Sequence, residues 1–175
     1  MFEPRESGSK NFLILKPGEV ARGVFAGEVF AFKQHWLKAQ KRGVVCPGFE
    51  KCEICAKVTD DMDDEEKKKY WPGFRFKVNF IVNENGAYTA KILEQGATVY
   101  DAIVALAADY DLKKHLIKIT RHGSGVDTTY SIVPVANGQL DAEKLALVSQ
   151  IVLLPLKAKE IKKTEPSESD DEPIF

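Results

Sequence analysis

Long apolar runs are missing from this chain of 175 residues. No segment reaches the roughly 18 apolar residues that a membrane-spanning helix needs, and no basic-then-apolar leader opens the sequence. We therefore expect a soluble, cytoplasmic protein that is not secreted. Hydrophobic residues still make up 44% of the chain, which is enough for a core, so the length predicts one domain with appendages.

Cysteine is scarce, and an odd count of three excludes a complete disulfide framework. All three cysteines follow His35 closely, at Cys46, Cys52 and Cys55. The two residues between Cys52 and Cys55 allow both thiolates to reach one ion. Three thiolates and one imidazole form a closed tetrahedral zinc site, so we predict a structural Zn²⁺ held by these four side chains.

Two alternatives to this metal site stay open. The cysteines could be ordinary small buried residues, although the polar sequence around them is typical of a surface loop. The fourth ligand could also be a residue other than His35, and the candidates are His115, His122 and Asp60.

Groupings typical of a catalytic centre are also absent. His122, Ser124 and Asp127 lie in one loop, whereas the members of a triad are held in space by separate elements. No carboxylate cluster suited to two metal ions accompanies the basic residues. We expect no enzymatic activity.

The net charge of −1 hides an uneven distribution along the chain. The last twelve residues carry five acids and no base, which leaves 25 basic against 21 acidic residues in the rest. A basic body with an acidic tail predicts a polyanionic partner and a tail that competes for the same surface. The alternative is a tail that only increases solubility. We expect residues 1–11 to form a flexible arm and residues 158–175 a disordered acidic tail.

Short strands and turns dominate the remaining pattern. Residues 20–32 are mostly β-formers interrupted by glycines, which predicts a bent strand. Residues 74–82 alternate, with Phe76 and Phe80 expected in the core, and Asn85-Gly86 predicts a tight hairpin turn. A second hairpin is expected over 116–135, and short helices over 98–110 and 140–148. This pattern predicts a mainly β fold, a small barrel or sandwich.

Aromatic and basic residues alternate on both sides of the cysteines. Single-stranded nucleic acid is bound by cations that follow its phosphates and by rings on which its bases stack. We therefore predict the following contacts, although any one of them could instead be a solvated charge or a core residue. The stacking platforms are Trp36, Tyr70 and Trp71, and the phosphate contacts are Lys33, Lys38, Lys41, Arg42, Arg75, Lys77 and Arg121.

Three motifs in this order resemble one protein family. They are His35…Cys46-Pro47…Cys52-x-x-Cys55, then Arg75-Phe76, and then Lys118-Ile-Thr-Arg-x-Gly-x-Gly-x-Asp-Thr-x-Tyr130. Together they are similar to the zinc-containing single-stranded-DNA-binding proteins of tailed bacteriophages, over about residues 12–134. The resemblance implies a five-stranded OB-fold barrel over 12–157, with a zinc-binding subdomain inserted at about 35–70.

The same resemblance implies a function and partners. It implies sequence-independent, cooperative coating of single-stranded DNA during replication, recombination and repair in the cytoplasm of a bacterial host cell. The end of the chain is similar to the acidic tip of bacterial single-strand-binding proteins, which implies recruitment of replication partners through Asp170, Asp171, Glu172, Pro173, Ile174 and Phe175. The rival hypotheses are a zinc-stabilised protein-interaction adaptor and an RNA-binding OB module.

Overall fold

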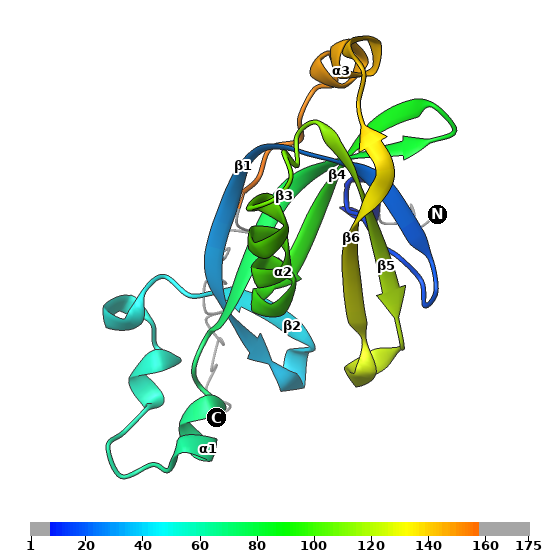
Figure 1. Ribbon diagram of the computed structural model, residues 1–175. Coiled ribbons are helices and arrows are strands. Elements are labelled where there is room, and N and C mark those ends of the chain that lie inside the picture. Colours follow the sequence, from blue (N-terminus) through cyan, green and yellow to red (C-terminus); the bar gives the residue numbers. More distant parts are fainter. Residues whose placement is uncertain (1–7, 158–175) are drawn as a thin grey trace, which may run out of the picture.

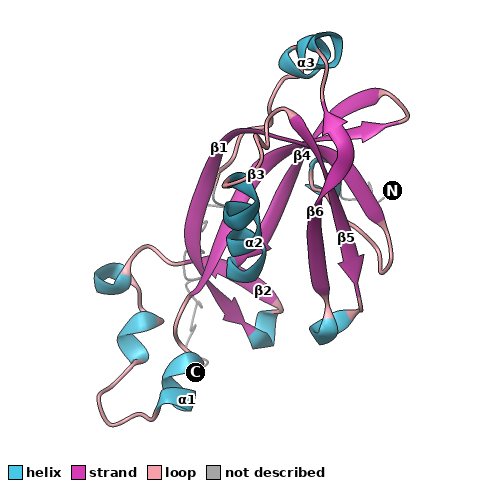
Figure 2. Cartoon of the chain, viewed as in Figure 1, coloured by secondary structure: helices cyan, strands magenta, loops and turns pink. Residues whose placement is uncertain are grey.

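The computed structural model describes residues 8–157 and shows a mainly β protein (Figure 1). The predictions for residues 1–7 and for the acidic tail 158–175, including Asp170–Phe175, lie outside the described residues. The strands are β1 (Val20–Leu37), β2 (Arg42–Val45), β3 (Gly73–Glu84), β4 (Ala87–Gly96), β5 (His115–His122) and β6 (Thr129–Gln139). The α-helices are α1 (Asp64–Lys68), α2 (Ala97–Ala107) and α3 (Ala142–Ser149), and short 3-10 turns complete the described chain (Figure 2).

All six strands belong to one antiparallel sheet in the order β4-β3-β1-β5-β6, with β2 added to the far end of β1. β4 and β6 are the two ends of this path, and no pairing joins them within residues 8–157. The mainly β prediction is therefore confirmed. The sheet does not close by hydrogen bonds, so the five-stranded barrel stays a prediction.

The long strand β1 bends and pairs with three other strands. Its first residues pair with β5 and β3, and its last residues pair with β3 and β2. Its register against β3 shifts between Ala26 and Phe30, where Gly27 has φ +71°. A Cβ at Gly23 would lie 2.2 Å from the carbonyl oxygen of Ile81, so only glycine permits this approach. The predicted bend is confirmed, but the strand continues beyond residue 32 and includes His35.

The main core lies on one face of the sheet. Phe76 and Phe80 are 1% and 0% exposed, which confirms the predicted alternation of β3. α2 covers this core with Tyr100, Ile103 and Leu106, the face that its helical period predicts. No residue of 38–72 belongs to this cluster.

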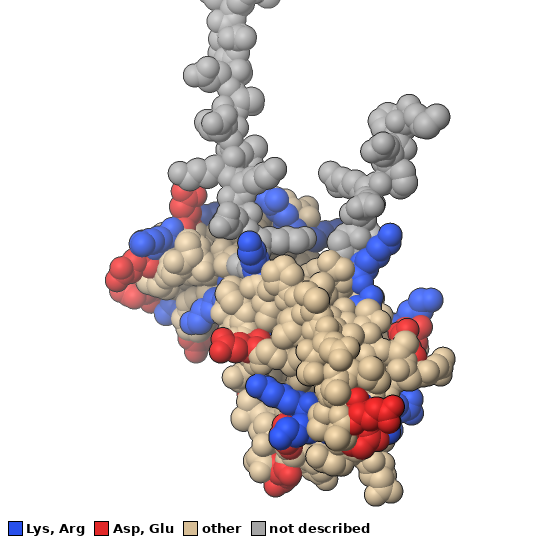
Figure 3. Space-filling model, turned by 90° about the horizontal axis from the view of Figure 1, so that it is seen from above, with Lys and Arg blue, Asp and Glu red and all other residues tan. Residues whose placement is uncertain are grey.

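A second, smaller core lies on the opposite face, where α3 packs. Val24 and Ile81 of the sheet meet Leu140 and Val148 there. Asp141 is the N-cap of α3, and its side chain accepts a hydrogen bond from the backbone N–H of Lys144 at 2.9 Å. At this end of the protein, acidic and basic side chains are interspersed around an uncharged area (Figure 3).

The two hairpins follow from turn residues. β3 and β4 are joined through Asn85 and Gly86, both at positive φ, which confirms the predicted Asn-Gly turn. The predicted second hairpin is β5 and β6.

The segment before β1 lies along β4. The N–H of Leu13 donates to the carbonyl of Ile92 at 2.9 Å, and residues 8–11 of the predicted flexible arm form a 3-10 turn.

Among residues 8–157, no helix combines the length and the hydrophobicity that a membrane span requires.

Candidate metal centre and nucleic-acid groove

Residues 38–72 form a lobe that projects from the ends of β1 and β3, away from α3 (Figure 1). The lobe contains β2, which pairs with the end of β1 so that Val44 lies opposite His35. Within this lobe, all of which the structure describes, Cys52 and Cys55 are the only buried residues. The lobe therefore has no hydrophobic core of its own.

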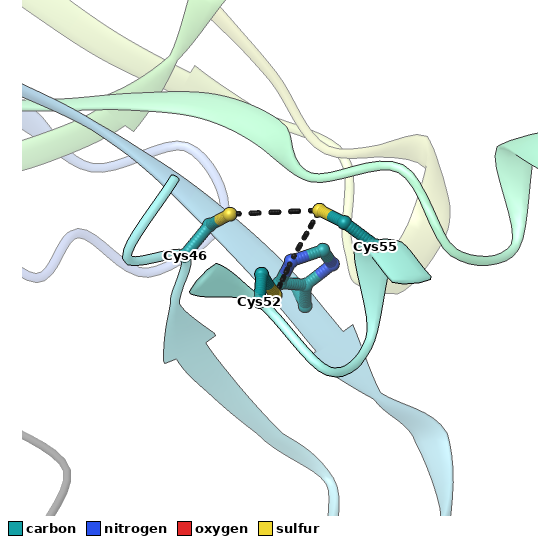
Figure 4. Close-up of side chains that lie close together, drawn as sticks. Cys46, Cys52 and Cys55 are labelled. Carbon is teal, nitrogen blue, oxygen red and sulfur yellow. Dashed lines mark hydrogen bonds between the residues drawn. The ribbon is translucent and has the colours of Figure 1, made fainter. Parts of the chain in front are cut away.

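Four side chains converge where the lobe joins β1. His35 comes from the strand, Cys46 directly follows β2, and Cys52 and Cys55 flank a tight turn whose Ala56 N–H donates to the carbonyl of Cys52 at 3.0 Å. The three sulfur atoms point toward one another (Figure 4). All four ligand atoms lie within 4.8 Å of one another.

The distances between these atoms are close to those of a tetrahedral site. Zinc–sulfur and zinc–nitrogen bond lengths at tetrahedral angles place two sulfurs about 3.8 Å apart, and a sulfur and a nitrogen about 3.6 Å apart. Here Cys46 Sγ and Cys55 Sγ are 3.7 Å apart, and His35 Nε2 lies 3.5 Å from Cys55 Sγ and 3.2 Å from Cys52 Sγ. Small adjustments of side-chain rotamers would place all four around one ion.

The electrostatics of the cluster also suit a divalent cation. Burial and the neighbouring thiols of Cys46 and Cys52 raise the pKa of Cys55 to about 12. Burial acts in the same direction on Cys52 and is the largest single influence, but hydrogen bonds from the backbone N–H groups of Cys55 and Ile54 and from the thiols of Cys55 and Cys46 together outweigh it and lower the pKa of Cys52. A bound cation removes the penalty for ionising neighbouring thiols, because a coordinating thiol is deprotonated.

The surroundings of His35 favour the neutral imidazole that a metal needs. Burial lowers its pKa, which favours the neutral ring, and the backbone of Tyr70 acts weakly in the opposite direction. Nε2 is the ring nitrogen that lies near the thiols, and the buried Nδ1 makes no hydrogen bond of regular geometry among the described residues. The predicted set of His35 and the three cysteines is thus a cluster that could hold a metal, with a donor set consistent with zinc.

The alternative fourth ligands lie elsewhere. Nε2 of His115 is 3.0 Å from the carbonyl oxygen of Val135, and Nε2 of His122 is 3.1 Å from Ser131 Oγ. Asp60 is exposed and is not part of the cluster.

A groove with a volume of about 510 Å³ runs between the lobe and the sheet. Trp36 from β1 and Trp71 from the end of the lobe are 61% and 50% exposed, so large parts of both ring systems are free. Four cations share the groove with a single acid, Glu65; these cations are Lys38, Lys68, Lys69 and Arg75. The groove therefore combines exposed rings with positive charge.

A second hollow of about 610 Å³ lies on the other side of Trp71 and shares that residue with the groove. Its lining includes Lys33, the exposed ring of Phe49, and the metal-cluster residues Cys46 and Cys55. The four candidate metal ligands therefore lie next to a surface that carries an aromatic ring and a cation.

The structure brings together only part of the predicted nucleic-acid surface. Lys33, Trp36, Lys38, Trp71 and Arg75 line the groove or the hollow. Lys41 in the β1–β2 turn and Arg42 at the start of β2 are exposed but line neither, and the half-buried Tyr70 lines neither.

Lys77 and Arg121 are occupied inside the protein. Lys77 is 5% exposed, and its Nζ donates to the carbonyl of Lys157 at 2.7 Å and lies 3.7 Å from Glu94. Arg121 donates from Nη1 to the carbonyl of Leu15 at 2.7 Å and from Nη2 to Thr128 at 3.2 Å. In this conformation the ammonium group of Lys77 is not accessible to a phosphate, and two guanidinium nitrogens of the half-buried Arg121 already donate within the protein.

The groove and the second hollow also contain residues that the sequence prediction missed. Lys68 and Lys69 line the groove, but they follow a run of acidic residues, and such a block of charges is typical of a solvated helix or loop. Phe49 lines the hollow, but it lies among the polar residues between two cysteines. The signal that could have found them is their nearness in sequence to Trp71 and to the cysteines.

Comparison with family models, with curated proteins and with solved structures finds no match to this chain.

Proposed function

We propose that this protein binds single-stranded DNA without reading its base sequence, on an OB-type sheet supported by a structural zinc ion. The observation that carries the proposal is the groove in which Trp36 and Trp71 stand among Lys38, Lys68, Lys69 and Arg75. Exposed rings stack on bases of any kind, and cations follow the phosphates, so this combination suits an unpaired strand.

The strand connectivity supports the OB-type assignment. β1, β3 and β4 form a meander, α2 follows, and the β5–β6 hairpin returns to pair with β1. This is the connectivity of a five-stranded Greek-key barrel, an architecture that is partly open. The opening lies between β4 and β6, and α2 contacts both of these strands.

The role proposed for zinc is structural. His35, Cys46, Cys52 and Cys55 would hold it with four protein ligands, which leaves no open position for water or substrate. The lobe that depends on this site carries Phe49, Lys68, Lys69 and Trp71. The site would therefore set the position of half of the proposed binding surface, and the protein would act as a binding protein and not as an enzyme.

The energetics follow from the same residues. Stacking contributes about 1–3 kcal/mol for each base on a ring, largely independent of base identity. Each neutralised phosphate of a single strand adds about −0.7 to the slope of log affinity against log salt. The three groove lysines predict a slope of about −2. Arg75 Nη2 lies 3.5 Å from Glu94 Oε1, so a phosphate would have to displace this ion pair before Arg75 raised the slope to about −3.

The wider role is proposed from the resemblance of the motifs. We infer coating of single-stranded DNA in phage replication, recombination and repair within the bacterial host, with self-association along the strand. Recruitment of replication proteins is proposed for Asp170–Phe175, which lie outside the described residues.

The deciding experiment is a titration with oligo-dT, oligo-rU and duplex DNA at two salt concentrations. We expect tight oligo-dT binding with the slope given above and much weaker duplex binding. Equal affinity for oligo-rU would favour the RNA-binding hypothesis. Absence of oligo-dT binding even in dilute buffer would refute the proposal and leave the adaptor hypothesis.

A pair of matched variants localises the binding surface. Replacing Lys68 and Lys69 together by alanine removes two groove cations and should lower the salt slope by about 1.4. Replacing Lys113 and Lys114, an adjacent pair of exposed lysines that do not line the groove, should leave the slope unchanged. Equal effects of the two double variants would contradict the assignment of the groove.

A further inference from the structure

The last described segment, residues 152–157, lies against the face of β3 that is opposite to the main core. After α3 the chain turns back toward β1 and β3 (Figure 1). The side-chain amide of Asn79 pairs with the backbone of Leu154 in both directions: Nδ2 donates to the carbonyl and Oδ1 accepts from the N–H, each at 2.9 Å. Lys77 Nζ donates to the carbonyl of Lys157 at 2.7 Å. We call residues 152–157 the strap.

The strap covers Lys77 and Asn79, which lie beside two aromatic rings of β1. Asn79 and Lys77 are only 3% and 5% exposed, although they point away from the main core. Lys77 Nζ lies 5.4 Å from the ring centroid of Phe32, whose ring is 5.8 Å from that of Phe30. A cation, a side-chain amide and two rings are the components of a single-strand-binding surface.

The contacts of the strap are few and exchangeable. It forms no helix or strand, and Val152 and Leu153 are 86% and 39% exposed. A segment with little buried apolar surface opens at low cost. The donor and acceptor of Asn79 match a peptide backbone, and the same pair can match the edge of a base. A strand could therefore satisfy the groups that the strap now satisfies.

We propose that the strap is an autoinhibitory cover: it occupies the face of β1 and β3 that carries Phe30, Phe32, Lys77 and Asn79, and a bound single strand displaces it. This inference rests on the proposed function. It assigns the inhibition to backbone hydrogen bonds of residues 152–157, which is distinct from competition by the charges of the acidic tail. The two differ in salt dependence, because hydrogen bonds of the neutral Asn79 amide are screened far less than exposed charges.

The test uses the full-length chain with one substitution in the strap. Leu154→Pro removes the N–H that donates a hydrogen bond to Asn79 Oδ1. Its matched control is Leu156→Pro, because the N–H of Leu156 has no hydrogen-bond partner in the described part of the chain. If the strap covers the face in most molecules, weakening its attachment raises the fraction of molecules that can bind a strand there. We expect Leu154→Pro to bind oligo-dT roughly fivefold to tenfold more tightly than wild type, at low and at high salt alike. The control should bind like wild type.

A second measurement needs no substitution. Amide hydrogen exchange of wild type is followed with and without oligo-dT, and the exchange of Leu154 should become faster when the strand is bound. Slower or unchanged exchange at Leu154 in the bound state would overturn the strap as a displaced cover, even if Leu154→Pro folded poorly.

The outcomes separate the two proposals. Equal oligo-dT affinity of wild type, Leu154→Pro and Leu156→Pro would overturn the strap while the proposed function stands. A gain that disappears at high salt would assign the inhibition to charge and would also overturn the strap. Absence of binding by all three proteins in dilute buffer would refute the proposed function and the strap together.

Discussion

If the four candidate ligands hold zinc as proposed, removal of the zinc should unfold the lobe and leave the sheet intact. Cys52 and Cys55 are the only buried residues within 38–72, so burial of apolar surface supplies little of the stability of this lobe. A structural zinc site contributes about 10–16 kcal/mol in small zinc-binding peptides. The main core contains no residue of 38–72, so it does not depend on the lobe. Unfolding should therefore not be two-state.

The perturbation is chelation of the wild type or the substitution Cys52→Ser. Elemental analysis should find one zinc per chain in the wild type and a loss of metal in Cys52→Ser. Amide exchange should become fast over residues 38–72 and remain slow in β3, and the fluorescence of Trp36 and Trp71 should change because both rings lie where the lobe meets the sheet. Glu53→Ser is the matched control, because Glu53 is exposed between two ligands and is not one itself.

Two results would refute this reasoning. A wild-type protein that is purified without metal and is still fully folded would remove the zinc hypothesis. Slow exchange over residues 38–72 after complete chelation would show that the lobe is held by contacts other than the metal.

Three further predictions concern other parts of the chain. Trp71→Ala should weaken binding about 5-fold to 150-fold for every oligonucleotide sequence in fluorescence anisotropy, from about 1–3 kcal/mol of stacking, whereas Val104→Ala on the exposed face of α2 should not. Deleting residues 164–175 should tighten DNA binding, most strongly at low salt, and abolish partner recruitment in pull-down assays; unchanged affinity would contradict competition by the tail. Gly23→Ala should lower the free energy of unfolding by about 3 kcal/mol in urea, because its Cβ would overlap a backbone carbonyl of β3; Gly73→Ala, with no atom closer than 3.9 Å, is the control.

The candidate metal ligands show which parts of a site local sequence can predict. Cys52 and Cys55 are close enough along the chain that their spacing alone places both thiols on one side of a turn. The choice of His35 among the candidate fourth ligands was less constrained by sequence. It depended on the pairing of β1 with β2, which brings this histidine next to Cys46.

The sequence by itself determined the features that depend on neighbouring residues: the alternation of β3, the Asn85-Gly86 turn, the bend of β1 and the cysteine spacing. Only the tertiary structure decided which cations stay accessible. The pattern of β3 places Lys77 away from the main core, but it cannot show that Lys157, 80 residues later, accepts its hydrogen bond. Periodicity reports on which side of a strand a residue lies, whereas exposure depends on what distant segments cover that side. For the same reason the groove of Trp36 and Trp71 exists only where β1 and the end of the lobe meet in space.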